Sequence, residues 1–519
     1  MNITFIQPED FRKQMETLRY EKGMDFLREL VGMDWGDEGI GAIYLLENST
    51  TKENIQVATR TTNREVPVIP TVSDIWKIAN MYEREAFDFF GIIFEGHPYL
   101  RRLYLRNDWV GYPLRKDYDE SEAVNPIRMY SESLENDYTH TLQPDGTIKL
   151  NPDTLFDKNE FVINIGPQHP ATHGVLRFRL SLEGEVINKT DIHCGYIHRG
   201  IEKMSEKLSY PQILALTDRL DYLSAHQNRH ALCMCIEKAM NIEVTERTQY
   251  IRTIMDELQR IDSHLLFISC AAMDLGALTA FIYGFRDREK ILDIFEEVTG
   301  GRLIQNYNVI GGVQADITAG FAQKVKAFCE YLPSKIKEYN DVFTNNIITR
   351  KRMVDVGILS REDAISYGCT GGTGRASGWA CDVRKRHPYA LYDKVDFKEI
   401  IYTKGDSFAR YLVRIDEIKE SLRIIEQLID NIPEGDYKVK TKPIIRLPEG
   451  NYHAAVEGSR GEFGVFIESR GEKSPYRIKF RPMGLPLIAS MNTLLKGCKI
   501  ADLMTIGATL DYVIPDIDR

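Results

Sequence analysis

The spacing of apolar residues changes along the chain and predicts different elements in different parts. Residues 41–47, GAIYLLE, are mostly apolar, which predicts a strand. Apolar residues recur at three- and four-residue steps through residues 73–90, which predicts a helix. Ser73 stands where its side chain could cap the start of that helix. Together these patterns predict a small α/β domain over residues 1–119.

Residues 120–158 follow a different pattern. The stretch is acidic and polar, contains three prolines and has no clear period. Such a composition indicates an extended linker or a tail that wraps over a partner surface.

The remaining residues, 159–519, are predicted to form a large, mainly helical domain with peripheral strands. In residues 176–182, leucine and phenylalanine alternate with arginine and serine, as in a half-buried strand, and Gly184 fits the turn after it. Two short apolar runs flank a polar turn within residues 464–480 and predict a hairpin. Helical periods dominate the stretches 208–300, 321–347 and 408–429. The predicted fold class is therefore α+β.

One long apolar segment raises the question of a membrane span. Residues 264–285 are 22 positions long and contain a single formal charge, that of Asp274. That length could span a bilayer, but a lone carboxylate near the middle would be costly there, and strongly charged sequence follows closely. The pattern predicts a fully buried core helix, or two short helices broken near Asp274.

The charge balance and the cysteines narrow the function classes. The 519 residues carry a formal net charge of −10, which argues against general nucleic-acid binding because that needs a basic surface. The eight cysteines include no CxxC pair, and the N-terminus has no secretory signal, so reduced thiols in a cytosolic compartment are expected. The scattered cysteines also argue against an iron–sulfur cluster or a zinc site held by this chain alone.

Candidate chemistry begins in the stretch GPQHPATHG at residues 166–174. His169 and His173 are four residues apart, a spacing that would place two metal ligands on one face of a helix, but Pro170 and the flanking glycines indicate a loop. A histidine there either donates a hydrogen bond to a ligand or is satisfied by the loop backbone. The pattern alone favours the second alternative.

A tyrosine and an aspartate on apolar stretches are the next candidates. Tyr222, in a segment 217–224 that is predicted to open a helix, offers a phenolic donor, although such a residue is more often part of the core. Burial would raise the pKa of Asp274 and let it hold a proton. Alternatively, Asp274 caps a helix that begins at Leu275.

The last candidates are a basic stretch at residues 198–203 and a glycine-rich stretch at residues 370–378, of which the second loosely resembles a phosphate loop. Neither contains GxxxxGK[ST] or GxGxxG. A nucleotide site there has little support from the sequence.

Longer motifs carry a resemblance to a known family. Residues 160–519 resemble the D subunit of respiratory complex I, the proton-pumping NADH:quinone oxidoreductase, through GPQHPATHG, HRGIEKM, DRLDYLS, DLGALT, FRDREKILD, RASGWACDVRK and ATLDYVIPDIDR. The N-terminal part is similar to the C subunit through EREAFDFFG, FEGHPYLRR and GYPLRKDY. The resemblance implies a fused C/D subunit, in which a C-like scaffold domain precedes a D-like domain.

The D subunit is similar in turn to the large subunit of nickel–iron hydrogenases, and that fold is expected for residues 159–519. Hydrogenases hold their metals with two CxxC pairs, because soft thiolates suit nickel and iron. The positions that match those pairs here are Asp221, Ser224, Val513 and Asp516. No thiolate is present, so the sequence argues against hydrogen activation. A subunit of a membrane-bound hydrogenase-like complex and a non-catalytic scaffold remain the alternatives.

The resemblance also implies a site. The D-like domain and a neighbouring B-type iron–sulfur subunit would form a quinone pocket, with electrons arriving from a 4Fe–4S cluster on that neighbour and no metal held by this chain. His173 and Tyr222 match the residues that hydrogen-bond the quinone headgroup and supply protons, and Asp274 matches the acid that partners the histidine. Expected near the partner's cluster are Arg199, Gln168 and His169.

One departure from the family bears on the quinone. In residues 300–312, Ile304 and Val309 stand where the family usually has a histidine and an arginine. The loss of ionisable neighbours should lower the potential of the cluster, so menaquinone is favoured over ubiquinone.

The resemblance implies an assembly and a place in the cell. The other expected partners are peripheral-arm subunits and a membrane-arm subunit at the quinone entrance, with no nucleic acid. We expect the chain to act only in an assembled, proton-translocating complex, as a peripheral protein on the cytoplasmic side of a bacterial inner membrane. The upstream electron donor, NADH or another, is not set by this chain.

Overall fold

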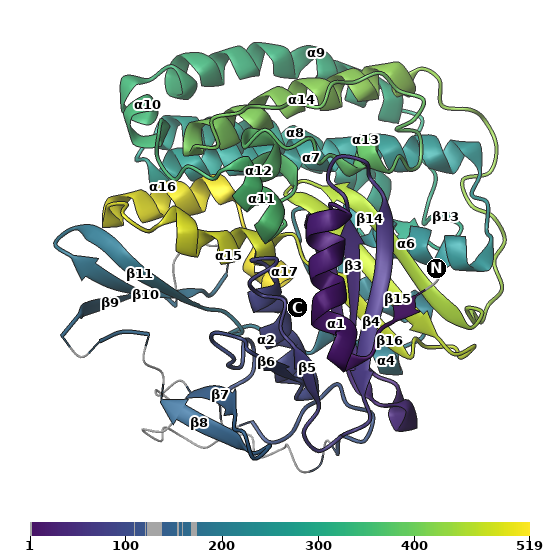
Figure 1. Cartoon of the computed structure of the whole chain (residues 1–519). Helices are drawn as coiled ribbons and strands as arrows, with labels where there is room; N and C mark the ends of the chain where they lie inside the picture. The colour runs from purple at the N-terminus through teal and green to yellow at the C-terminus, as the bar shows by residue number, and fades with distance from the viewer. Residues whose placement is uncertain are drawn as a thin grey trace.

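The first part of the chain forms a small α/β unit (Figure 1). The computed structural model describes residues 3–107, 109–119, 121, 138–152, 155–157, 159–167 and 174–519. The elements of the unit are β1 Thr4–Phe5, α1 Pro8–Glu16, η1 Thr17–Glu21, β2 Phe26–Asp34, η2 Gly36–Glu38, β3 Ile40–Glu47, β4 Asn54–Thr61, β5 Val68–Pro70, α2 Ala79–Phe90 and β6 Ile93–Glu95. Its main sheet has the order β1-β4-β3-β2, in which only the β1–β4 pair is parallel. α1 lies against β4, and α2 lies against β2.

The predicted strand at residues 41–47 is confirmed as β3, whereas the predicted helix at residues 73–90 begins later than expected. α2 starts at Ala79, and its N-cap residue, Ile78, makes no side-chain cap, so the prediction of a cap at Ser73 was wrong. Turns replace the first part of the helix because the backbone finds tertiary partners there. The amide of Ile78 donates to the carbonyl of Ser366 at 3.1 Å, and the amide of Lys77 donates to the hydroxyl of Ser366 at 3.0 Å.

Two small antiparallel sheets follow. β7 (Tyr138–Leu142) and β8 (Ile148–Pro152) form a hairpin inside the stretch predicted to be an extended linker, a feature that its composition did not indicate. β9 (Phe161–Ile165), β10 (Arg177–Glu183) and β11 (Val186–His193) form a sheet in the order β11-β10-β9. β10 and the turn at Gly184, with φ of +61°, confirm the predicted strand and turn.

Long helices dominate the rest of the chain, as predicted. α7, α8, α9 and α14 pack together in a bundle at the top of Figure 1 around a shared apolar core. The helices of this part are α4 Ile201–Lys207, α5 Tyr210–Thr217, α6 Ala225–Met240, α7 Glu246–Asp274, α8 Leu278–Thr299, α9 Phe321–Tyr339, η5 Asn340–Thr344, α10 Ile347–Met353, α11 Arg361–Tyr367, α12 Gly371–Ala376, α13 Val383–Arg386, α14 Ser407–Ile429, α15 Gly484–Leu494, α16 Ile500–Leu510 and α17 Ile514–Asp518. The predicted helix at 408–429 is confirmed as α14.

The strands of this part lie beside the bundle. β14 (Gly450–Gly458), β15 (Gly461–Ser469) and β16 (Arg477–Arg481) form an antiparallel sheet in which β15 and β16 make the predicted hairpin. β12 (Asn308–Val309) and β13 (Gly312–Val313) form a short pair. The structure is thus a mixed α and β fold with several small sheets, while the likeness to a hydrogenase large subunit stays a prediction.

The apolar segment at residues 264–285 is broken, and the break lies at Asp274. α7 ends at this residue, Gly276 takes a φ of +80°, and α8 begins at Leu278. Leu278 and Ile282 on α8 are 63% and 60% exposed, so the alternative of one fully buried helix was wrong. Within the described residues, no helix is both long and apolar enough to cross a membrane.

The N-terminal unit packs tightly against the later part of the chain. Phe466 of β15 belongs to the same buried cluster as Val31 and Ile43 of the N-terminal sheet. The buried guanidinium of Arg28 pairs with Glu462 at 2.7 Å across the same contact. The two parts therefore share both apolar and ionic contacts, although the domain boundaries at 119 and 158 remain predictions.

Candidate functional site

The segment that carries Tyr222 is a turn between two helices. α5 ends at Thr217 and α6 begins at Ala225, so the prediction that residues 217–224 open a helix was wrong. Asp221 shapes the turn. Its carboxylate accepts from the backbone amide two residues later at 3.0 Å, and its carbonyl accepts from the amide of Ser224 at 3.0 Å.

A buried arginine ties this turn to two distant segments. Arg460, in the turn between β14 and β15, is 1% exposed. Its Nη1 donates to Asp221 Oδ2 and to Ser263 Oγ of α7, both at 3.0 Å, and its Nη2 donates to Asp511 Oδ1 at 3.0 Å. We call these four side chains the Arg460 group. Sequence reasoning missed Arg460 and Asp511. The available signal was a lone arginine between two glycines in GSRG, at residues 458–461, just before the predicted hairpin.

Tyr222 is half-buried against an apolar wall. It packs with Leu223, Leu266, Val513 and Cys270. Burial raises the pKa of Tyr222 to about 12, and the carboxylates of the Arg460 group act in the same direction while Arg460 itself opposes them. The phenol is therefore protonated near neutral pH and can donate its proton.

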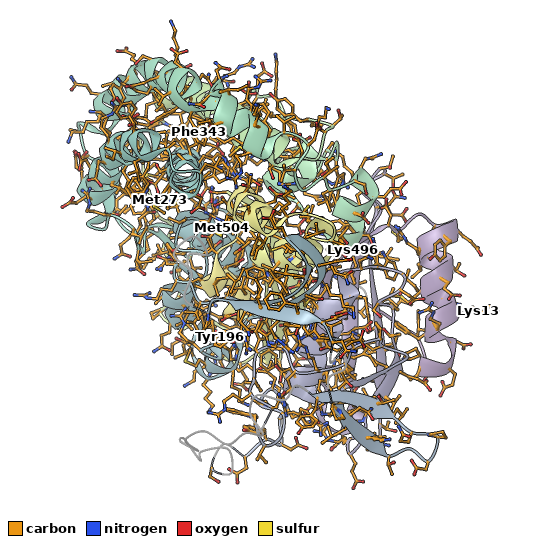
Figure 2. The ribbon with its side chains drawn as sticks, turned by 90° about the vertical axis from the view of Figure 1, so that its left-hand side faces the viewer. Lys13, Tyr196, Met273, Phe343, Lys496 and Met504 are labelled. Carbon is orange, nitrogen blue, oxygen red and sulfur yellow. The ribbon has the colours of Figure 1, made fainter. Side chains whose placement is uncertain are left out.

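Asp274 lies at the C-terminal end of α7, one helical turn after Cys270; the neighbouring Met273 is labelled in Figure 2. Its Oδ2 is buried and has no hydrogen-bond partner among the described residues. Burial raises the pKa of Asp274 to about 6. The negative end of the helix dipole also disfavours a charged carboxylate there. The helix-cap alternative was wrong, because the N-cap of α8 is Ala277.

Cys270 connects Asp274 with Tyr222. It packs in the same cluster as Tyr222, and burial, followed by the charges of Asp511 and Asp274, raises the pKa of its thiol to about 12. Tyr222 and Asp274 therefore both lie close to one protonated thiol.

Of the stretch GPQHPATHG, the structure describes Gly166, Pro167 and Gly174. Gln168, His169 and His173 lie outside the described residues, so their predicted roles stay predictions. Gly174, which follows the loop, comes so close to α17 that a Cβ there would lie 2.5 Å from Cβ of Ile514. Gly174 therefore lies beside the start of α17, next to Val513, which belongs to the apolar wall around Tyr222.

Arg199 lies at the surface, before α4, and apart from the buried Arg460 group. Its Nη2 donates to the carbonyl of Arg219, at the start of the Tyr222 turn, at 3.2 Å. It also lines a hollow of about 520 Å³ together with Tyr104 and Met204. This exposed position leaves its guanidinium accessible to another protein.

The segment with the unusual residues Ile304 and Val309 packs against the same turn. The amide of Asn306 donates to Asp218 Oδ2 at 2.8 Å. Both replaced positions are half-buried. Ile304 and Val309 therefore bring uncharged, apolar side chains to the neighbourhood of this turn.

Asp221, Ser224, Val513 and Asp516 are the four positions at which the predicted likeness to hydrogenases would place thiolates. Asp516 accepts from the amide of Gly484 at 2.8 Å, and burial, with the charge of Asp221, raises its pKa to about 7. Within the part of the chain that the structure describes, no three histidine, cysteine, aspartate or glutamate side chains gather as metal ligands. All eight cysteines are free thiols.

The glycine-rich stretch at residues 370–378 has a structural role. It forms the buried helix α12, in which a Cβ at Gly374 would lie 2.4 Å from the carbonyl oxygen of Cys369. Arg375 of this helix pairs with Glu457 at 2.6 Å and with Glu417 at 2.9 Å. Its guanidinium is therefore occupied by buried carboxylates.

Comparisons with known proteins agree on one family. Residues 274–519 match the family model "Respiratory-chain NADH dehydrogenase, 49 Kd subunit", and residues 4–124 match "Respiratory-chain NADH dehydrogenase, 30 Kd subunit". The chain is 69% identical to the NADH-quinone oxidoreductase C/D subunit of Phocaeicola vulgatus over 99% of each protein. It is 68% identical to that of Bacteroides thetaiotaomicron over 100% of this chain and 99% of the relative. It is also 44% identical to the separate D subunit of Desulforamulus reducens, over 69% of this chain and 98% of that protein.

Proposed function

Since this chain belongs to the family of NADH-quinone oxidoreductase C/D subunits, we propose that Tyr222 and Asp274 serve a quinone-reducing site of such a complex. The observation that carries the proposal is that both residues lie near Cys270: Tyr222 packs with it in one apolar cluster, and the charge of Asp274 acts on its thiol. A largely apolar slot with a few convergent polar groups is what a hydrophobic ligand with a polar head requires.

The chemistry of the two groups suits quinone reduction. A quinone takes up two electrons and two protons, and negative charge develops on its carbonyl oxygens, so proton donors must already be in place. The phenol of Tyr222, with a pKa of about 12, holds its proton until such a charge appears. Asp274, with a pKa of about 6, exchanges its proton near neutral pH, and its open Oδ2 can accept a hydrogen bond from His173.

The remaining parts of the proposal concern the assembly. Electrons would arrive from a 4Fe–4S cluster on a B-type iron–sulfur subunit that docks beside Arg199, with Gln168 and His169 on the same side. Other peripheral-arm subunits and a membrane-arm subunit at the quinone entrance complete the surroundings. The chain would act only within this proton-translocating complex, on the cytoplasmic side of the inner membrane. The C-like part over residues 1–119 would serve as a scaffold joined by the linker 120–158.

Substitution of the proposed donors tests the function. Tyr222→Phe and His173→Ala should each lower quinone reductase activity of the assembled complex by about 10²-fold or more, because a positioned proton donor contributes at least that much. The measurement is turnover with a soluble quinone, alongside the protein composition of the purified complex. Full turnover in a correctly assembled complex would favour the scaffold alternative. Stoichiometric nickel in the complex would favour the hydrogenase-like one.

The proposed quinone has a separate test. Ile304 and Val309 leave two usual cationic positions uncharged, so the partner's cluster should have a low and nearly pH-independent potential, which suits menaquinone. A redox titration of the assembled complex at two pH values measures this. A high potential that falls steeply with pH would contradict the proposal.

A further inference from the structure

A strongly basic hollow lies away from the Tyr222 wall, where residues 101–107 meet the end of β11. Its volume is about 370 Å³, and Tyr196, labelled in Figure 2, lines it. The basic side chains around it are Arg84, Arg101, Arg102, Arg106, Arg177 and His193. The chain as a whole is acidic, so this concentration of positive charge is local.

The carboxylates near the hollow are already engaged. Asp191 pairs with Arg101 and accepts from His193 Nε2 at 2.8 Å. Asp88 pairs with Arg102 at 2.8 Å and also accepts three backbone amides. Neither of these acids forms an ion pair with Arg84 or Arg177 of the same hollow.

Arg84 is a deeply buried guanidinium in the lining of the hollow. It is 4% exposed, and its Nε and Nη2 donate only to the carbonyls of Arg101 and Arg102, at 3.3 and 3.2 Å. Among the described residues, no carboxylate lies within ion-pair distance of it. Burial, and next the charge of Arg101, lower the pKa of Arg84 to about 10, with Asp191 acting in the opposite direction. A buried cation without a counterion is costly. The hollow beside Arg84 has room for an anion, which would reduce this cost.

A second guanidinium, that of the half-buried Arg177, lines the same hollow. Arg177 Nε donates to the amide oxygen of Asn164 at 3.0 Å, and no carboxylate among the described residues pairs with it. Two guanidinium groups that converge on one concave space can hold several oxygens of one compact anion, because each presents a planar fork of N–H donors.

We propose that this hollow binds a multiply charged phosphate-type anion through Arg84 and Arg177. The ligand is a free phosphate or pyrophosphate group or the phosphate of an anionic lipid headgroup. An acidic segment of a neighbouring protein is the competing occupant. This inference uses none of the residues of the proposed quinone site.

Titration calorimetry on the full-length chain tests the proposal at constant ionic strength. Sodium pyrophosphate should bind, and Arg84→Met should weaken binding at least tenfold, as should Arg177→Met. Arg302→Met is the matched control, because Arg302 lies at the surface and pairs with Asp293 and Glu296. In phosphate-free buffer, Arg84→Met should melt close to wild type, since it removes an uncompensated charge. If it does not fold, Arg177→Met carries the test.

Two further arms separate the sources. Vesicles with phosphatidic acid that bind the wild type but not Arg84→Met would identify a lipid headgroup, whereas binding of pyrophosphate alone would identify a soluble anion. Equal pyrophosphate binding by wild type and both hollow variants would overturn the proposal. Tighter binding of a hexaglutamate peptide than of pyrophosphate would also overturn it, in favour of an acidic protein segment.

Discussion

The middle and the end of α7 place carboxylates in opposite circumstances. In the middle, Glu257 pairs with Arg384 at 3.0 Å and with Arg260 at 3.3 Å, and the pKa of Glu257 stays below its usual range despite the opposing effect of burial. At the end, Asp274 has a buried oxygen without a donor among the described residues, and burial raises its pKa to about 6. One helix therefore carries a neutralised, structural acid and an acid that can exchange a proton.

The pKa values of Glu257 and Asp274 shift in opposite directions because the two carboxylates have different partners, and not because Asp274 is more deeply buried. Arg384 also pairs with Asp382 at 2.7 Å and with Glu417 at 2.6 Å, and Arg375 joins the same group through Glu417. We call these side chains, with Glu257, the Arg384 network. A buried charge with good partners holds elements together, whereas one without a partner is available for chemistry.

Removing a cation from the Arg384 network should have the largest effect. Arg384→Met would leave three buried carboxylates without one of their guanidinium partners, and breaking a buried pair in this way costs about 3–5 kcal/mol. Urea denaturation followed by circular dichroism should show a large drop in the midpoint, or the protein should fail to accumulate. Arg302→Met is the control, because a surface pair contributes about 0–1 kcal/mol. Equal midpoints for the two variants would show that the network is not structural.

An intermediate effect is expected at Asp274. Its pKa is higher in the folded chain than its ordinary value of 3.8, so the folded state binds the proton more tightly. The free energy of unfolding should therefore fall as pH rises from about 4 to about 6, and solvent access reduces this loss to about 1 kcal/mol. Asp274→Asn should abolish the loss, so it should be more stable than wild type at pH 7.5 and nearly equal at pH 4. The urea midpoints of both proteins at the two pH values measure this, and a gap that does not change with pH would refute it.

The same comparison explains what the sequence could predict. β10 and α14 follow from local periodicity, and β3 follows from an apolar run that is buried along its whole length. The start of α2 does not, since its backbone bonds to Ser366, far along the chain. Asp274 was identifiable as a lone acid in an apolar run. The Arg460 group was not, because Arg460 and Asp221 are 239 residues apart and only the tertiary fold brings them together.

The smallest effect on the free energy of unfolding is expected for a substitution at Leu278, just after the break between α7 and α8. Leu265 on α7 is fully buried, whereas Leu278 on α8 is 63% exposed, although both belong to the apolar run that the sequence presents as continuous. Leu265→Ala should cost about 2–5 kcal/mol because it leaves a cavity, and Leu278→Ala should change the free energy of unfolding by about 0.5 kcal/mol or less. Urea midpoints of the two variants compare the halves directly. A large loss in Leu278→Ala would mean that α8 is buried at its start, and Asp274 would then lie inside a core helix pair rather than at the edge of an open apolar wall.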